Sequence, residues 1–97
     1  MKPLEFHPAA ETELREAVTY YNMKVDGLGA DLTSKVRVAA EEIRRHPEAW
    51  PIVRPNVRRK RVPRFPYGLV YQEFEDKIVV LAVMHLNRKP DYWTDRF

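Results

Sequence analysis

The sequence predicts a single α+β domain in which an N-terminal strand and a helical hairpin precede a three-stranded antiparallel meander, in the order β-α-α-β-β-β. Apolar residues recur at helical spacing through the first half of the chain, and strand-like apolar runs fill the second half. At 97 residues the chain has room for one hydrophobic core, so residues 1–97 are expected to form one domain.

The first half is predicted to be a strand followed by two helices. Residues Lys2 to His7 alternate loosely in polarity, and Pro8 suits the first turn of a helix. The apolar face of the first helix consists of Ala10, Leu14, Ala17, Val18 and Tyr21. After a turn at Gly27 and Gly29, the apolar face of the second helix consists of Leu28, Leu32, Val36, Ala39 and Ile43. This helix ends at His46-Pro47, and the short connection between the helices predicts an antiparallel hairpin.

The second half is predicted to contain three strands. A loop with prolines at 47, 51 and 55 leads to a basic strand from Val57 to Val62. A second strand runs from Leu69 to Phe74, and Glu75-Asp76 forms a tight turn. The last strand, from Lys77 to Leu86, is a nearly continuous apolar run, which predicts burial on both faces at the centre of the sheet.

Composition places the chain among globular proteins. It has no Cys, 44% hydrophobic residues and 32% charged residues. No stretch reaches the roughly 18 apolar residues of a membrane span, and no basic-then-apolar signal peptide is present. We therefore expect a soluble cytoplasmic protein without membrane contact.

Positive charge is concentrated in one segment. From Arg54 to Arg64 there are six basic residues and no acid, whereas the remaining chain carries 11 basic and 14 acidic residues. Such a block indicates binding to a polyanion or an acidic partner, although it could instead protect an edge strand from pairing with other chains. The residues predicted to bind a partner or nucleic acid are Arg58, Arg59, Lys60, Arg61, Arg64 and Arg88.

The basic segment and the segment from His85 to Trp93 contain residues that could act on a phosphate. Arg59 and Arg61 alternate along a strand, so they point the same way about 7 Å apart, close to the spacing of successive phosphates. Cleavage of RNA through its 2′-hydroxyl needs a base, an acid and cations, and His85 or Tyr92 could move protons while Arg88 holds the phosphate. The alternative is that these residues are structural. His85 would then be a lone histidine at the end of an apolar strand, and Tyr92 and Trp93 would be aromatic anchors that close the core.

Other side chains are assigned to packing or the surface. Trp50 and Tyr71 are expected in the core, and Phe65 and Tyr67 are expected to be exposed on a turn. The helix carboxylates that we explain by dipole and solvation effects are Glu11, Glu13, Glu16, Glu41 and Glu42. No metal-ligand set, Gly-rich phosphate loop or nucleophile elbow is present, so no cofactor or metal is expected.

The chain resembles the RelE/ParE superfamily of toxins from bacterial type II toxin-antitoxin systems. The resemblance covers nearly the whole chain and lies in the order of four segments: F-H-P-A-A-E-T-E-L, I-R-R-H-P-E, R-R-x-R-V-x-R-F-P-Y-G-L-V-Y and I-V-V-L-A-V-M-H-L-N-R-K-P-D-Y-W. It implies a growth-inhibiting toxin neutralised by a cognate antitoxin, with operator DNA bound only through the toxin-antitoxin complex.

Two targets are known within this superfamily. RelE-like members are mRNA interferases that cut messenger RNA on the ribosome, and ParE-like members inhibit DNA gyrase without nuclease activity. By resemblance to the RelE-like site, Arg59 and Arg61 occupy the positions of two strand lysines, Arg88 that of a later arginine, and Tyr92 lies near the C-terminal tyrosine. These residues and His85 would be catalytic only in a RelE-like enzyme.

Three departures favour the ParE-like, plasmid-stabilisation branch. Gly68 stands where RelE-like enzymes commonly carry a phosphate-binding arginine. Arginine also stays charged, so it cannot replace a lysine that must lose a proton. The H-x-x-R-x-P-x-Y-W ending resembles ParE-type members. A gyrase inhibitor is therefore favoured over a ribosome-dependent endonuclease, and a non-toxic binding module is the third alternative.

Overall fold

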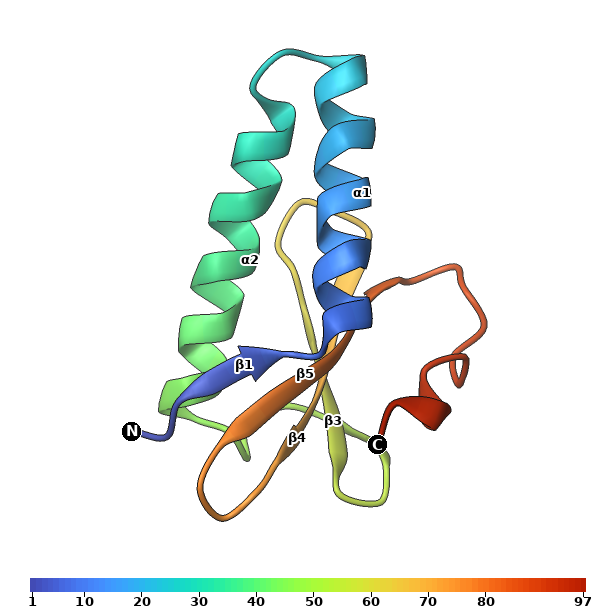
Figure 1. Cartoon of the computed structure of the whole chain (residues 1–97). Helices are drawn as coiled ribbons and strands as arrows, with labels where there is room; N and C mark the ends of the chain where they lie inside the picture. Colours follow the sequence, from blue (N-terminus) through green and yellow to red (C-terminus); the bar gives the residue numbers. More distant parts are fainter.

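The computed structural model describes all 97 residues and confirms the α+β class. In chain order the elements are β1 (Leu4–Phe6), α1 (Pro8–Lys24), α2 (Leu28–Arg45), β2 (Ile52–Arg54), β3 (Val57–Arg61), β4 (Tyr67–Glu73), β5 (Ile78–His85) and the short 3-10 helix η1 (Thr94–Arg96). The two helices form an antiparallel hairpin that rises from the sheet, and the C-terminal segment lies on the opposite flank from α2 (Figure 1).

The sheet has five strands in the order β1-β5-β4-β3-β2 and is mixed. β1 pairs in parallel with β5, and the other neighbours are antiparallel. The additional strand is β2, which lies in the segment predicted to be a loop. It has three residues between Pro51 and Pro55, and Asn56 turns the chain into β3 with a φ of 65°. So short a strand, bounded by prolines, leaves no alternating pattern in the sequence.

The apolar strand β5 is interior, but β4 is the central strand. β5 lies between β1 and β4 and is buried from Val80 to Met84, as its apolar run predicts. The expectation that β5 forms the centre of the sheet is wrong by one position. The reason is β2, which adds a strand on the far side of β3 and shifts the middle of the sheet to β4.

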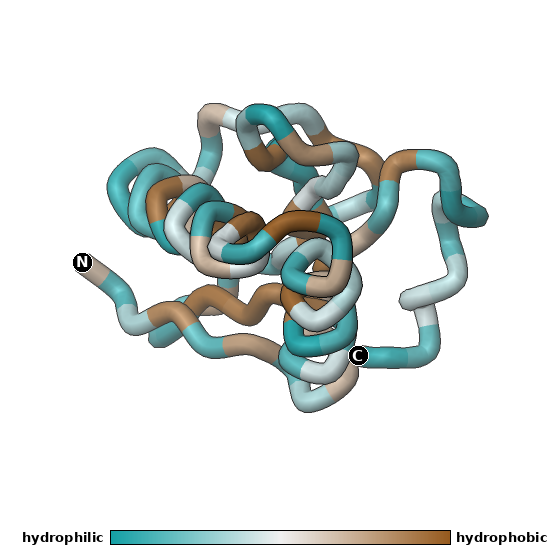
Figure 2. The backbone as a smooth tube through the Cα atoms, turned by 90° about the horizontal axis from the view of Figure 1, so that it is seen from above, coloured by the Kyte–Doolittle hydropathy of each residue, from teal (hydrophilic) through white to brown (hydrophobic).

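The sheet separates two hydrophobic clusters. The larger one fills the space between the helices and the sheet, and the smaller one lies on the other face around Trp93. Seen from above, hydrophobic segments gather in the middle and the outer sides of the helices are hydrophilic (Figure 2). The helices therefore cover one face of the sheet, and the C-terminal segment covers part of the other.

The ends of the helices follow from local chemistry. His7 caps α1, because its Nδ1 accepts a hydrogen bond from the amide of Ala9 at 3.0 Å. Gly27 has a φ of 86° in the turn between the helices. Gly29 allows the helices to approach, since a β-carbon there would lie 2.6 Å from the carbonyl oxygen of Val18. Neither helix combines the length and the hydropathy that crossing a membrane requires.

Candidate functional site

The two strand arginines lie on the sheet face away from the helices. Arg59 and Arg61 lie two and four residues after Val57 on β3, so they share the face of Val57, which is buried in the cluster around Trp93. Lys60 points to the other face, where its Nζ lies 3.8 Å from the carboxylate of Glu42. The prediction that Arg59 and Arg61 share a face is consistent with this alternation.

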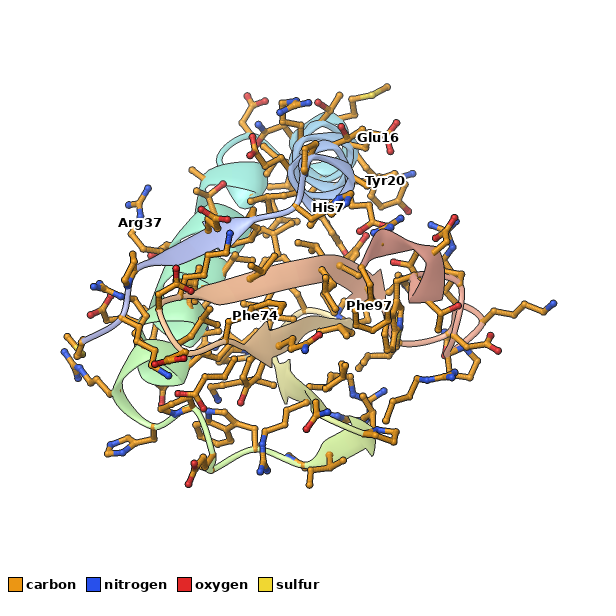
Figure 3. The ribbon with its side chains drawn as sticks, turned by 60° about the horizontal axis from the view of Figure 1, so that its bottom comes forward. His7, Glu16, Tyr20, Arg37, Phe74 and Phe97 are labelled. Atoms are coloured by element: carbon orange, nitrogen blue, oxygen red, sulfur yellow. The ribbon has the colours of Figure 1, made fainter.

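His85 lies on the helix side of the sheet. It pairs with Tyr67 on β4, and the two rings are 5.2 Å apart in an edge-to-face arrangement. Its Nδ1 accepts a hydrogen bond from the amide of Asn87 at 3.1 Å. His85 also lines a pocket of about 280 Å³ with Glu16 and Tyr20, two residues that lie on the same flank of α1 in Figure 3. The sheet therefore separates His85 from Arg59 and Arg61.

Arg88 and Tyr92 come together on the C-terminal segment. The guanidinium carbon of Arg88 lies 3.9 Å from the centre of the Tyr92 ring, a cation-π geometry. The Tyr92 hydroxyl donates a hydrogen bond of 2.7 Å to Glu13 on α1, and the same carboxylate lies 3.8 Å from Arg88. Of the five candidate catalytic residues, Arg88 contacts both Tyr92 and His85: its amide donates a hydrogen bond to the His85 carbonyl at 3.0 Å, and Arg88 and His85 line the same pocket.

Glu13 organises this side of the molecule and was missed by the sequence reasoning. Its side chain is only 12% exposed, and it accepts hydrogen bonds from Tyr92, from the Val83 amide and from both terminal nitrogens of Arg96. β1 ends at Phe6, so Val83 on this edge of β5 has no partner strand. Glu13 is therefore a hydrogen-bond acceptor that anchors the C-terminal segment, and it is not a solvated helix carboxylate.

Burial and hydrogen bonds to Glu13 shift the pKa of two groups here. Burial and the hydrogen bond to Glu13 raise the pKa of Tyr92 well above that of a free phenol. The hydrogen bond from Arg96 to Glu13 raises the pKa of that guanidinium as well. Tyr92 is therefore a neutral hydrogen-bond donor near pH 7, and its hydroxyl is engaged by a carboxylate.

The predicted binding residues form two groups. Arg58 donates to the Trp50 carbonyl at 2.7 Å, and the Lys60 ammonium lies 3.7 Å above the Trp50 ring, so both are held by local contacts. Within the segment from Arg54 to Arg64, four arginines have no salt bridge or side-chain hydrogen bond: the predicted residues Arg59, Arg61 and Arg64, together with Arg54. We call these four residues the basic ridge.

The aromatic residues of the turn are not available for stacking. Phe65 is 9% exposed and packs 5.1 Å from the ring of Tyr21, and Tyr67 packs against the same cluster. The expectation that Phe65 and Tyr67 are exposed is wrong, because the turn folds back under α1. Tyr71 is buried, as predicted, and Trp50 is partly buried against the larger cluster. Trp93 is buried as well, which agrees with the structural alternative.

Acidic and histidine side chains do not gather into a metal site. No group of three His, Asp or Glu side chains lies close enough together to hold an ion.

Comparisons with known proteins indicate one family. The family model for the ParE toxin of the type II toxin-antitoxin system parDE matches residues 4–90. A search of curated proteins gave no match. Among solved structures, a chain described as the chromosomal ParDE TA system from P. aeruginosa is similar, with a TM-score of 0.72 and 15% identity over 90% of this chain and 98% of that chain. At this identity the structural match concerns the fold.

Proposed function

Because the chain belongs to the ParE toxin family of type II toxin-antitoxin systems, we propose that it inhibits bacterial growth by acting on DNA gyrase and is neutralised by a cognate antitoxin. The family match over residues 4–90 is the observation that carries this proposal. The gyrase target and the neutralisation by an antitoxin are the parts of this proposal that go beyond family membership.

The geometry favours a binding role for the arginines over catalysis. A ribonuclease of the RelE-like kind needs a base, an acid and cations around one phosphate. Here Arg59 and Arg61 lie on one face of the sheet and His85 lies on the other. The Tyr92 hydroxyl already donates to Glu13. Arg59 and Arg61 themselves cannot exchange a proton near pH 7, since arginine stays charged.

Antitoxin binding is supported by apolar side chains left exposed on the helical hairpin. Met23 is 81% exposed, and Tyr20, Val25 and Val38 are more than half exposed. A partner that covers these side chains and binds only the folded toxin stabilises it by mass action. Saturating antitoxin should therefore raise the melting temperature of the chain, and an unchanged melting temperature would contradict this part of the proposal.

The target can be tested in cells that express the chain without its antitoxin. Labelled thymidine and labelled amino acids are followed for the first minutes after induction. We expect thymidine incorporation to fall first, with filamentation and a DNA damage response. Early loss of amino acid incorporation would instead support the mRNA interferase, and unaffected growth would support the non-toxic binding module.

A variant series separates binding from cleavage. If the chain were a ribosome-dependent endonuclease, Arg59→Ala, Arg61→Ala and Arg88→Ala would each abolish cleavage of messenger RNA in a translation extract. Our proposal expects no cleavage by the unmodified chain in the same extract. Cleavage by the unmodified chain that these substitutions remove would overturn the gyrase assignment.

A further inference from the structure

We propose that the basic ridge binds the phosphate backbone of duplex DNA, with Arg59 and Arg61 as its central contacts. This contact is independent of base sequence and differs from operator recognition by a toxin-antitoxin complex. It does not depend on gyrase being the target, because it concerns the toxin and DNA alone.

The ridge concentrates positive charge that no carboxylate neutralises. Elsewhere in the chain, Arg15, Arg44, Arg88 and Arg96 lie within 4.0 Å of a carboxylate, and the two other unpaired arginines, Arg37 and Arg45, lie on α2. In the ridge no arginine has such a partner, and no acidic residue occurs between Arg54 and Arg64. Four guanidiniums without counter-charges on two adjacent strands and a turn produce the positive field that phosphates neutralise.

Arg59 is held in place by packing. Its Cγ and Cδ lie across Gly68 on β4, where an added β-carbon would be 3.0 Å from both atoms. Because Gly68 has no side chain, the aliphatic part of Arg59 packs directly on the β4 backbone. Arg59 is half-buried, and its guanidinium has no protein partner. A guanidinium whose stem is fixed before binding loses less side-chain entropy when it contacts an anion.

The spacing of the ridge arginines suits a phosphate backbone. Arg59 and Arg61 face the same side of β3 about 7 Å apart. Arg61 and Arg59 also line a shallow pocket with Lys60, Trp50 and Pro51. The chain then turns at Arg64, which has a φ of 69° and an exposed side chain. A row of cations at this spacing matches the phosphates along one DNA strand.

Duplex DNA fits the ridge better than single-stranded nucleic acid. Single-strand binders place aromatic side chains where unpaired bases can stack. Here Phe65 is buried, Tyr67 packs in the core and the Trp50 ring is covered by Lys60. With no stacking surface beside the arginines, the ridge offers contacts to phosphates alone, and these are fully presented by a double helix.

The test is the fluorescence anisotropy of a labelled 20-base-pair duplex of arbitrary sequence titrated with the purified chain between 50 and 200 mM NaCl. Four phosphate contacts predict a slope of log K against log salt of about −3 to −4. The double variant Arg59→Ala, Arg61→Ala should bind about tenfold more weakly at 50 mM NaCl, with a slope smaller by about 2.

The matched control removes the same charge elsewhere. Arg37 and Arg45 are exposed on α2 without partners, and Arg37 points away from the sheet in Figure 3. The double variant Arg37→Ala, Arg45→Ala should change the affinity less than twofold. The substitution Gly68→Ala, which alters no charge, should weaken binding about two- to threefold by displacing Arg59.

Three results would overturn the proposal. The first is no duplex binding at 50 mM NaCl, and the second is an equal loss in the α2 control and the ridge variant. The third is tighter binding to a single-stranded RNA of equal length than to the duplex. Melting temperatures of all variants, measured alongside, show that each compared protein is folded.

Discussion

Two regions of the molecule use arginine in opposite ways. On the C-terminal segment, Arg96 donates both terminal nitrogens to Glu13 and is only 15% exposed on its side chain. On β3, Arg59 and Arg61 have no counter-charge at all. The chain has the same residue type in both places, so residue type alone does not reveal its role.

The difference lies in what each side chain contacts. Glu13 accepts a hydrogen bond from the Val83 amide at the unpaired edge of β5. It also anchors the C-terminal segment, whose Trp93 packs in the second hydrophobic cluster. Removing these contacts exposes core surface. Removing Arg61 exposes no core surface, and removing Arg59 uncovers only the backbone at Gly68. The C-terminal segment should therefore determine stability, and the ridge should determine binding. The following predictions test this division, beginning with the largest effect.

Truncation of Trp93 should have the largest effect on stability. The indole is 1% exposed and packs on the sheet face that the helices do not cover. Trp93→Ala should lower the free energy of unfolding by about 4 kcal/mol. The neighbouring Phe97 is 69% exposed, so Phe97→Ala serves as a control with an effect below about 1 kcal/mol. Urea denaturation measures both, and similar losses would contradict the packing role of Trp93.

Removal of the Glu13 carboxylate should come next. Glu13→Ala leaves the Tyr92 hydroxyl, the Val83 amide and Arg96 without their shared acceptor, at a cost of about 3 kcal/mol. Glu11 lies on the same helix in a loose, exposed pair with Arg15 at 3.9 Å. Glu11→Ala should therefore change stability by less than about 0.5 kcal/mol. If the two substitutions lowered the free energy of unfolding equally in urea denaturation, the anchoring role of Glu13 would be contradicted.

Stability should also decline at alkaline pH because of buried tyrosines. Burial raises the pKa of Tyr71 to about 12, and its hydroxyl donates to the Pro47 carbonyl. The same phenol has a pKa of about 10 when unfolded, so the folded state holds the proton more tightly. This contribution is complete below about pH 10 and is lost between about pH 10 and 12. Unfolding free energies should fall over that range, less steeply in Tyr71→Phe, and parallel pH curves would count against this account.

The smallest effect on stability is expected at the ridge. Arg59→Ala and Arg61→Ala remove exposed or half-buried charges that have no partner, so each should change the free energy of unfolding by less than about 0.5 kcal/mol. Thermal and urea denaturation measure this change. A decrease in the free energy of unfolding above about 2 kcal/mol would show that the ridge stabilises the fold, and the two regions would then not differ in role.

The fold was predictable to the extent that apolar patterning determines it. The helices and the strands β3, β4 and β5 carry the periodicity that their packing requires, and their ends were placed within about two residues. The strand β2 was not predicted, because Ile52 and Val53 are exposed and their pairing depends on the turn at Asn56. Parallel pairing of β1 with β5 is a long-range contact that no local pattern specifies.

The candidate site was predictable only in part. The charge of the ridge is visible in the sequence, but the separation of His85 from Arg59 depends on strand phase. Dipole and solvation effects predict a surface position for Glu13, although it lies three residues after Ala10 and four before Ala17, both buried on α1. A carboxylate on the buried face of a helix is a signal for a buried pair, and it was available in the spacing.

The most direct test of the proposed function uses purified components. DNA gyrase, relaxed plasmid and ATP are incubated with the chain, with and without its antitoxin, and supercoiling is followed on a gel. The account predicts that the chain blocks supercoiling and that the antitoxin restores it. Undisturbed supercoiling at an excess of folded toxin, with cleavage of messenger RNA in a parallel translation extract, would contradict it.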